Sequence, residues 1–129
     1  MQSFYTDQQQ LLAKTTREFA LSELGPKASN IDEHEIFPRE QFMSLATLGF
    51  TGLTLDSKYG GSDGNYVDMM VVIEEIASVC GSSSTVLITH VSLASQTINR
   101  FGNNEQKSRW LPDLCSGKKI AAFSLSEPQ

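Results

Sequence analysis

The feature that most constrains this sequence is a run of 24 residues, from 76 to 99, without a single Lys, Arg, Asp or Glu. Twelve of these residues are Ser, Thr, Asn, Gln or His, and the run GSSS at residues 81–84 interrupts them, which excludes a membrane span. A helix over residues 83–101, which is uncharged as far as Asn99, is expected to be buried nearly all round. Because a chain of 129 residues offers few such places, we expect groups outside it to cover part of this helix.

The composition excludes several classes of protein. With 10 basic and 15 acidic side chains the net charge is −5, which argues against nucleic acid or an anionic membrane as a partner. Cys80 and Cys115 lack the spacing of a disulfide framework or a redox motif, so free thiols in a reducing compartment are expected. No targeting segment is recognisable, and a cytoplasmic location is favoured, or the mitochondrial matrix if the source is eukaryotic.

Helical periodicity dominates the remainder of the chain. Capping-box spacing at Thr6 and at Asn103 predicts the starts of the first and last helices. Gly25 and Pro26 are expected to end the first helix near Leu24, followed by a connector over residues 27–37. A second helix is predicted from Pro38 to a left-handed Gly49, and a third over residues 66–79.

The last helix and the end of the chain complete the predicted fold. The helix is expected to run to about Leu114, with Trp110 and Leu111 facing inward. Residues 120–126 alternate apolar and serine side chains at Phe123 to Ser126, which is a strand pattern without a partner in this chain. The predicted fold class is all-α, an antiparallel bundle of about five helices with one terminal β-strand that belongs to a β-domain outside the chain.

Several polar clusters could carry chemistry, but each has a simpler structural explanation. The GGSDG loop at residues 60–64 lacks the order and the lysine of a phosphate-binding loop, which favours a plain helix connection. The run DEHE at residues 32–35 offers metal ligands, yet four adjacent residues cannot all face one ion, which favours a solvated connector. Glu74 and Glu75 point about 100° apart on a helix and are expected at the surface or in ion pairs.

His90 and Cys115 are the remaining candidates for chemistry. His90 has Val86 and Ala94 as its neighbours four residues away, so a hydrogen-bonded structural histidine is favoured over a catalytic one. Cys115, at a helix end, is expected to be inert rather than nucleophilic. The residues alone indicate no self-contained catalytic set and no metal site.

A resemblance to a known family adds to this interpretation. The run FSLSEP at residues 123–128 resembles the flavin-contacting motif of acyl-CoA dehydrogenases, where an aromatic-x-aliphatic-Thr/Ser-Glu-Pro strand opens the β-domain. Further runs match the family in order, namely LGFTGL at residues 48–53, YGG at 59–61, EEIA at 74–77 and FGNNEQK at 101–107. The chain therefore resembles the N-terminal helical domain of this family as a fragment that ends at the start of the β-domain.

This resemblance implies a domain division and an activity. Residues 1–118 would form the helical domain, and residues 119–129 the first strand of a middle β-domain. The parent would be an FAD-dependent enzyme that converts acyl-CoA thioesters to 2,3-enoyl-CoA, with an electron-transfer flavoprotein as a typical acceptor and a homotetramer as the usual assembly. The catalytic glutamate usually lies in a C-terminal domain, so no catalytic residue is expected here and the chain alone is expected to be inactive.

Two sets of site residues follow from the resemblance. Flavin contacts are implied at Phe123, Leu125 and Ser126, where amides and a hydroxyl can bond the polar edge of the ring. Acyl-chain contacts are implied at Thr85, Val86, Thr89 and Leu93, with core packing as the alternative. The family often has proline where Asp56 stands. For the whole chain, the alternative is a non-enzymatic helical interaction module or a degenerate paralogue.

Overall fold

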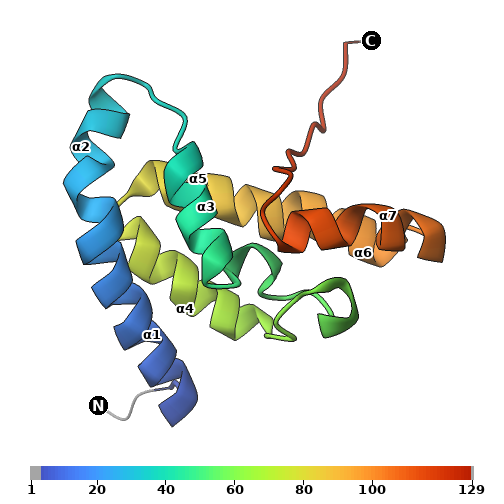
Figure 1. The fold of residues 1–129 in the computed structure, drawn as a ribbon, viewed down its shortest axis with the longest axis horizontal. Helices are drawn as coiled ribbons and strands as arrows, with labels where there is room; N and C mark the ends of the chain where they lie inside the picture. Colours follow the sequence, from blue (N-terminus) through green and yellow to red (C-terminus); the bar gives the residue numbers. More distant parts are fainter. Residues whose placement is uncertain (1–3, 129) are drawn as a thin grey trace.

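The computed structural model describes residues 4–128, which form five helical rods (Figure 1). Two of the rods contain two α-helices joined without interruption by a π-helical segment. The elements are α1 (Asp7–Phe19), a π-helical segment (Ala20–Leu24), α2 (Gly25–Glu33), α3 (Arg39–Thr47), α4 (Tyr66–Ala77), α5 (Gly81–Ile88), a second π-helical segment (Thr89–Ser95), α6 (Gln96–Phe101) and α7 (Asn104–Cys115). Two 3-10 turns, Phe50–Gly52 and Ser57–Tyr59, lie between α3 and α4. The predicted all-α fold is confirmed, and none of the described helices is long and apolar enough to cross a bilayer.

The first rod begins as predicted but continues farther. The Thr6 hydroxyl accepts the N–H of Gln9 at 3.2 Å, and the Gln9 side chain accepts the N–H of Thr6 at 3.1 Å, which forms the predicted capping box. The prediction that the helix ends near Leu24 is wrong. In the π-helical segment the Gly25 N–H donates to the Ala20 carbonyl five residues earlier, and the chain enters α2 with Pro26 in its first turn, where no N–H is needed. Most of the predicted connector is therefore helical.

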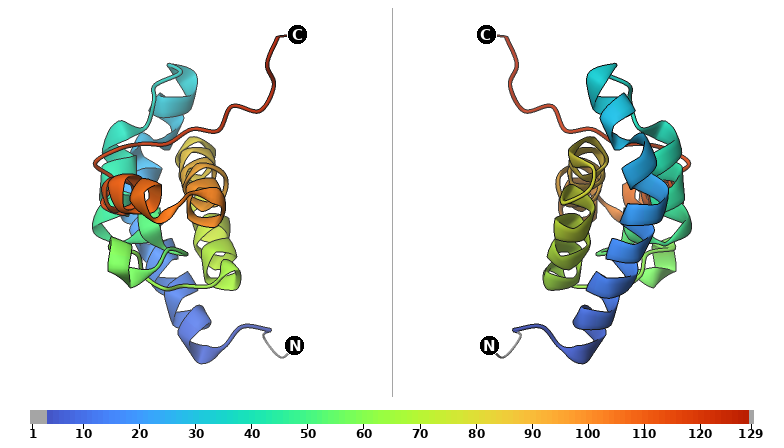
Figure 2. Two further views of the ribbon diagram at one scale, coloured as in Figure 1. Left: turned by 90° about the vertical axis from the view of Figure 1, so that its right-hand side faces the viewer. Right: turned by 90° about the vertical axis from the view of Figure 1, so that its left-hand side faces the viewer.

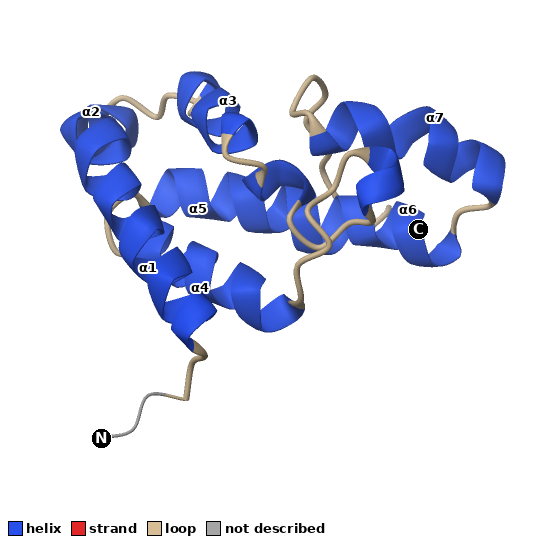
Figure 3. Cartoon of the chain, turned by 60° about the horizontal axis from the view of Figure 1, so that its bottom comes forward, coloured by secondary structure: helices blue, strands red, loops and turns tan. Residues whose placement is uncertain are grey.

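The main core lies where the first rod meets α3, α4 and α5 (Figure 3). Helices α4 and α5 run side by side in opposite directions, joined by a tight turn at residues 78–80 (Figures 1 and 3). The Arg17–Glu75 ion pair, at 2.6 Å, links α1 to α4. The buried members of this core are Ala20, Leu24, Leu45, Phe50, Leu53, Met69, Val72, Ile73, Ile76, Cys80, Leu87 and Val91.

A second, smaller cluster of buried side chains joins α7 to the segment after α3. It consists of Leu55, Leu111, Leu114 and Cys115. The buried Thr51 hydroxyl donates to the Cys115 carbonyl at 2.6 Å and so satisfies one carbonyl at the end of α7. The prediction that Trp110 faces inward is wrong. Leu111 and Leu114 set the buried face of α7, and Trp110 beside them lies at the surface, with Arg109 and Lys119 each 4.9 Å from its ring centre.

The glycine-rich loop folds back on the chain that precedes it. The backbone N–H groups of residues 62–64 donate to carbonyls of residues 52–55 over 2.8 to 3.0 Å. A side chain at Gly61 would clash with the Leu55 carbonyl, so this approach requires glycine. The loop amides are thus used internally, which supports the plain connection over a phosphate site. Asp56 caps the turn before the loop by accepting the Lys58 N–H at 2.8 Å, at the position where the family often has proline.

Residues 120–128 leave the helical body as an irregular segment (Figure 2). The predicted strand is not formed in this chain, because a strand needs a neighbour to accept its backbone hydrogen bonds and the described residues supply none. The preceding turn is held by the Lys119 N–H, which donates to the Asp113 carbonyl at 3.1 Å. The division into residues 1–118 and 119–129 stays a prediction, and residues 1–3 and 129 lie outside the described residues.

Candidate functional site

The rod over residues 81–101 carries no charge as far as Asn99 and is called the charge-free rod below. One of its faces is open to solvent in this chain. Thr85 is exposed, Val86 and Thr89 are half-buried, and Leu93 is 46% exposed. On the opposite side, side chains such as Leu87 pack into the main core. This chain by itself therefore leaves one side of the helix uncovered, and its cover by groups outside the chain stays a prediction. The four residues predicted to contact an acyl chain share the open face.

The chemistry of this face is apolar, although many of its residues carry hydroxyl groups. Thr85, Ser92 and Thr97 donate their hydroxyl hydrogens to carbonyl oxygens four residues earlier, over 2.6 to 2.9 Å. These three hydroxyls are satisfied within the helix, and the two threonines also carry methyl groups that a ligand can contact. Such a surface suits an alkyl chain better than a charged or strongly polar ligand.

His90, in the second π-helical segment, points into the interior and is fully buried. Its Nε2 lies 3.1 Å from the Leu114 carbonyl oxygen near the end of α7, and its Nδ1 lies 3.0 Å from the Ala121 backbone nitrogen. The Phe42 ring meets the imidazole nearly at right angles, with 5.0 Å between ring centres. His90 is thus a hydrogen-bonded core residue, as the sequence favoured.

The partners of His90 determine its protonation state. The Leu114 carbonyl can only accept a hydrogen bond, so Nε2 carries the hydrogen, and the Ala121 N–H can only donate, so Nδ1 presents its lone pair. Burial lowers the pKa of His90 below its usual value of 6.5, while backbone groups of Leu114 and Thr51 act in the opposite direction. The side chain is therefore a neutral imidazole that holds two separate parts of the chain.

The residues predicted to contact a flavin lie on the segment that leaves the helical body. Phe123 is 42% exposed, Leu125 is 79% exposed, and Ser126 is exposed. Within residues 4–128, the backbone groups of residues 122–128 have no hydrogen-bond partner. The segment thus offers N–H and hydroxyl donors and carbonyl acceptors next to apolar side chains, and these groups could bond the polar edge of a planar ring system.

The two predicted sets of site residues are linked by the bond between His90 and Ala121. The structure gathers the acyl-contact residues on one face, but it leaves Phe123, Leu125 and Ser126 exposed rather than packed against that face. Sequence reasoning missed the link because the partners of His90 lie 24 and 31 residues away along the chain. No local spacing could have indicated them.

The other polar candidates have structural roles. Glu75 pairs with Arg17, and Glu74 accepts a hydrogen bond from the Tyr5 hydroxyl at 3.4 Å, as expected for surface carboxylates. Burial raises the pKa of the Cys115 thiol to about 11, so it is inert at neutral pH, as predicted.

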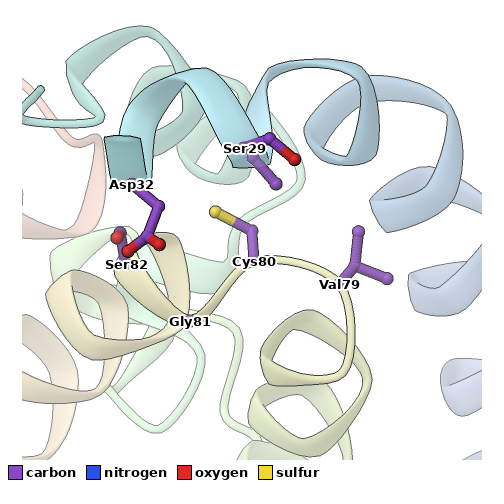
Figure 4. Close-up of a pocket in the computed structure, with 7 residues that line it drawn as sticks. Ser29, Asp32, Val79, Cys80, Gly81 and Ser82 are labelled. Carbon is purple, nitrogen blue, oxygen red and sulfur yellow. The ribbon is translucent and has the colours of Figure 1, made fainter. Parts of the chain in front are cut away.

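A hollow of about 320 Å³ lies where α2 passes the first turn of α5 (Figure 4). Asp32 extends from α2 toward Ser82, and the buried Cys80 thiol lies 3.1 Å from the Ser83 hydroxyl. The remaining residues of the DEHE run are exposed, and the described residues contain no group of side chains that could hold a metal ion. The four side chains of the run are thus exposed to solvent, but Asp32 and Glu33 lie in α2 rather than in a connector.

Comparison with known proteins identifies the family. The family model described as acyl-CoA dehydrogenase, N-terminal domain, matches residues 6–118 of this chain. The chain belongs to the acyl-CoA dehydrogenase family. Among curated relatives, a short-chain-specific acyl-CoA dehydrogenase of Clostridium acetobutylicum is 38% identical over 95% of this chain. An acryloyl-CoA reductase (NADH) of Anaerotignum propionicum is 37% identical over the same share.

Solved structures agree with the helical fold. Butyryl-CoA dehydrogenase of Megasphaera elsdenii has a TM-score of 0.88 and 34% identity over 99% of this chain and 34% of that one. A Bacillus anthracis acyl-CoA dehydrogenase complexed with FAD has a TM-score of 0.87 and 30% identity over 97% of this chain and 21% of that one. A chain from a structure of the electron transferring flavoprotein of Acidaminococcus fermentans has a TM-score of 0.91 and 30% identity over 99% of this chain and 34% of that one.

The length of the relatives limits what this chain contains. The matched region covers 32% of the Clostridium protein and 31% of the Anaerotignum protein, so the chain spans about a third of the curated relatives it matches. The substrate, cofactor and partners of a whole enzyme are therefore matters of proposal for this chain.

Proposed function

We propose that this chain acts as the N-terminal helical domain, residues 1–118, of an FAD-dependent acyl-CoA dehydrogenase, followed by the first strand of the β-domain. The observation that carries the proposal is the family match over residues 6–118, together with the uncharged open face on the rod that the family resemblance assigns to the acyl chain. The activity is α,β-dehydrogenation: the α-carbon of the thioester loses a proton, the β-carbon loses a hydride, and a C=C bond forms.

The role of the charge-free rod is to form one wall of the acyl pocket. Thr85, Val86, Thr89 and Leu93 present methyl and aliphatic groups on one open face. An alkyl chain buried there loses contact with water without leaving any charge unpaired. No residue of this chain is assigned as the catalytic base, which belongs to another part of the enzyme.

The role of residues 123–126 is to contact the flavin. FAD, when bound, accepts the hydride and thereby makes the dehydrogenation possible. The residues present fit this group, because the backbone amides of residues 123–126 and the Ser126 hydroxyl have no partner among residues 4–128 and Phe123 offers an aromatic surface. The similarity to an acyl-CoA dehydrogenase structure complexed with FAD supports the same assignment.

The partners follow from the same proposal. The reduced cofactor would pass its electrons to an acceptor such as an electron-transfer flavoprotein, a choice supported by the similarity to a chain from a structure of such a protein. We further propose a homotetramer for the whole enzyme, and a cytoplasmic location or the mitochondrial matrix.

The test compares two preparations. The coding sequence beyond Gln129 should continue into a β-domain, and the purified longer product should be yellow and should reduce an electron-acceptor dye when given butyryl-CoA. The chain of 129 residues alone should retain no FAD and reduce no dye, because most of the cofactor site lies outside it. A stop codon directly after Gln129, or a yellow and dye-reducing short chain, would contradict the proposal.

A further inference from the structure

We propose that His90 is a positioning residue: it holds the start of residues 120–128 against the rod that carries the acyl-contact face. The inference rests on the proposed function, since it concerns how the acyl wall and the flavin-contacting segment are kept in one arrangement. Its basis is the bond at 3.0 Å between His90 Nδ1 and the backbone nitrogen of Ala121.

Ala121 is the last residue at which the segment is attached to the helical body. It is half-buried and packs against the second cluster, around Leu111 and Leu114. Every residue from 122 to 128 is exposed and without a hydrogen bond among the described residues. The direction in which the chain leaves the body is therefore set at Ala121, two residues before Phe123.

The helix side of this link lies next to the acyl-contact residues. His90 directly follows Thr89, which is half-buried on the open face, while the imidazole points inward from the same turn. The other attachments lie before residue 120: the Lys119 N–H donates to the Asp113 carbonyl at 3.1 Å, and Lys119 and Lys118 lie 2.8 and 3.6 Å from the Asp113 carboxylate. They hold the turn at the end of α7, and ion pairs near the surface contribute little. The buried imidazole is thus the rigid connection between the two surfaces.

Two substitutions separate the two hydrogen bonds of His90. In His90→Asn the side-chain oxygen can occupy the place of Nδ1 and accept from Ala121, but the side chain is too short to reach the Leu114 carbonyl. In His90→Gln the terminal NH₂ can donate to the Leu114 carbonyl, but nothing replaces Nδ1. If His90 had only a structural role, the two variants would differ in stability but would hold Ala121 equally well. If His90 positions the segment, only His90→Gln should free Ala121 from the helical body.

The first experiment measures the link in the chain of 129 residues by NMR. The wild type should show an imidazole hydrogen on Nε2 and a protected Ala121 amide. Exchange of that amide should be about tenfold faster in His90→Gln and close to wild type in His90→Asn. The exposed His34, changed to Gln, serves as the control and should leave the Ala121 amide unchanged.

The second experiment measures FAD release from the longer holoenzyme. Dissociation should be about fivefold faster in His90→Gln than in His90→Asn, as expected for the loss of one hydrogen bond. Ala121→Pro removes the same bond from the donor side, so the double variant His90→Gln/Ala121→Pro should release FAD no faster than either single variant. If His90→Gln folds poorly, Ala121→Pro alone still tests the bond and should release FAD about fivefold faster than the wild type.

Failure of this inference can be distinguished from failure of the proposed function. Equal Ala121 exchange and equal FAD release in His90→Gln and His90→Asn, with a wild type that binds FAD, would overturn this inference alone. A longer wild-type protein that binds no FAD would overturn the proposed function and, with it, the flavin role of His90.

Discussion

His90 shows how a single buried side chain can connect segments that are distant in sequence. Its neutral form is required by the bond with Ala121, because a hydrogen on Nδ1 would face the Ala121 N–H instead of accepting from it. From the sequence, the absence of charged neighbours correctly favoured a structural histidine. The identity of the partners depends on how α7 and the final segment fold over the rod, which no spacing around His90 encodes.

The lowered pKa of His90 makes the stability of the chain depend on pH. Because the folded-state pKa lies below the unfolded value of about 6.5, the unfolded state binds more protons at pH values between the two. The contribution of the neutral His90 to the free energy of unfolding is fully present above about pH 6.5 and is lost as the pH falls through the folded-state pKa. No charged side chain contributes to this shift. We therefore expect the free energy of unfolding to fall between about pH 7.5 and pH 5.5.

Urea denaturation at several pH values checks this expectation. The part of the pH dependence that belongs to His90 should be absent in His90→Asn and retained in His34→Gln, since His34 is exposed. An identical pH dependence in wild type and His90→Asn would show that His90 titrates alike in the folded and unfolded states.

At the scale of single elements, helix starts were predictable and one helix end was not. A capping box needs only two residues three positions apart, so Thr6 and Asn103 could be recognised in the sequence, and both boxes are present. The break expected at Gly25 and Pro26 is avoided because the π-helical segment Ala20–Leu24 changes the hydrogen-bond register before the proline. That rearrangement is stabilised by packing of buried residues such as Leu24, and packing is not visible in local propensity.

The cap of α7 gives a prediction at this scale. Asn103 Oδ1 accepts the Gln106 N–H at 2.9 Å, and the Gln106 side chain accepts the Asn103 N–H at 2.8 Å. We expect Asn103→Ala to lower the free energy of unfolding by about 1 kcal/mol, because it leaves a helix N–H without its partner. The adjacent, exposed Asn104 is the control, and Asn104→Ala should change stability by less than about 0.5 kcal/mol. Urea denaturation of the two variants measures the difference, and equal effects would contradict the role of the cap.

At the scale of the whole molecule, two sequence features indicated surfaces that need further neighbours, and the structure shows where these surfaces lie. A helix without charges and a strand pattern without a partner both need neighbours that the chain does not contain. In the structure, residues such as Leu93 are exposed on one face of the charge-free rod. The final segment extends away from the helical body (Figures 1 and 2). The orientation of Phe123, Leu125 and Ser126 toward a cofactor could not be predicted in the same way, because it depends on residues that would pair with the segment.

The open face can be tested by placing a charge on it. Leu93 is 46% exposed, so Leu93→Lys should change the stability of the chain alone by less than about 0.5 kcal/mol, since the ammonium group stays in water. In the longer enzyme the same charge would be buried against the acyl chain without a partner, and we expect kcat/KM for butyryl-CoA to fall at least about tenfold. Leu21, which is 60% exposed on the first rod, provides the matched control, and Leu21→Lys should leave both quantities nearly unchanged. If Leu93→Lys and Leu21→Lys had equal kcat/KM, the face around Leu93 would not contact the substrate, and the missing charges of this helix would need another explanation.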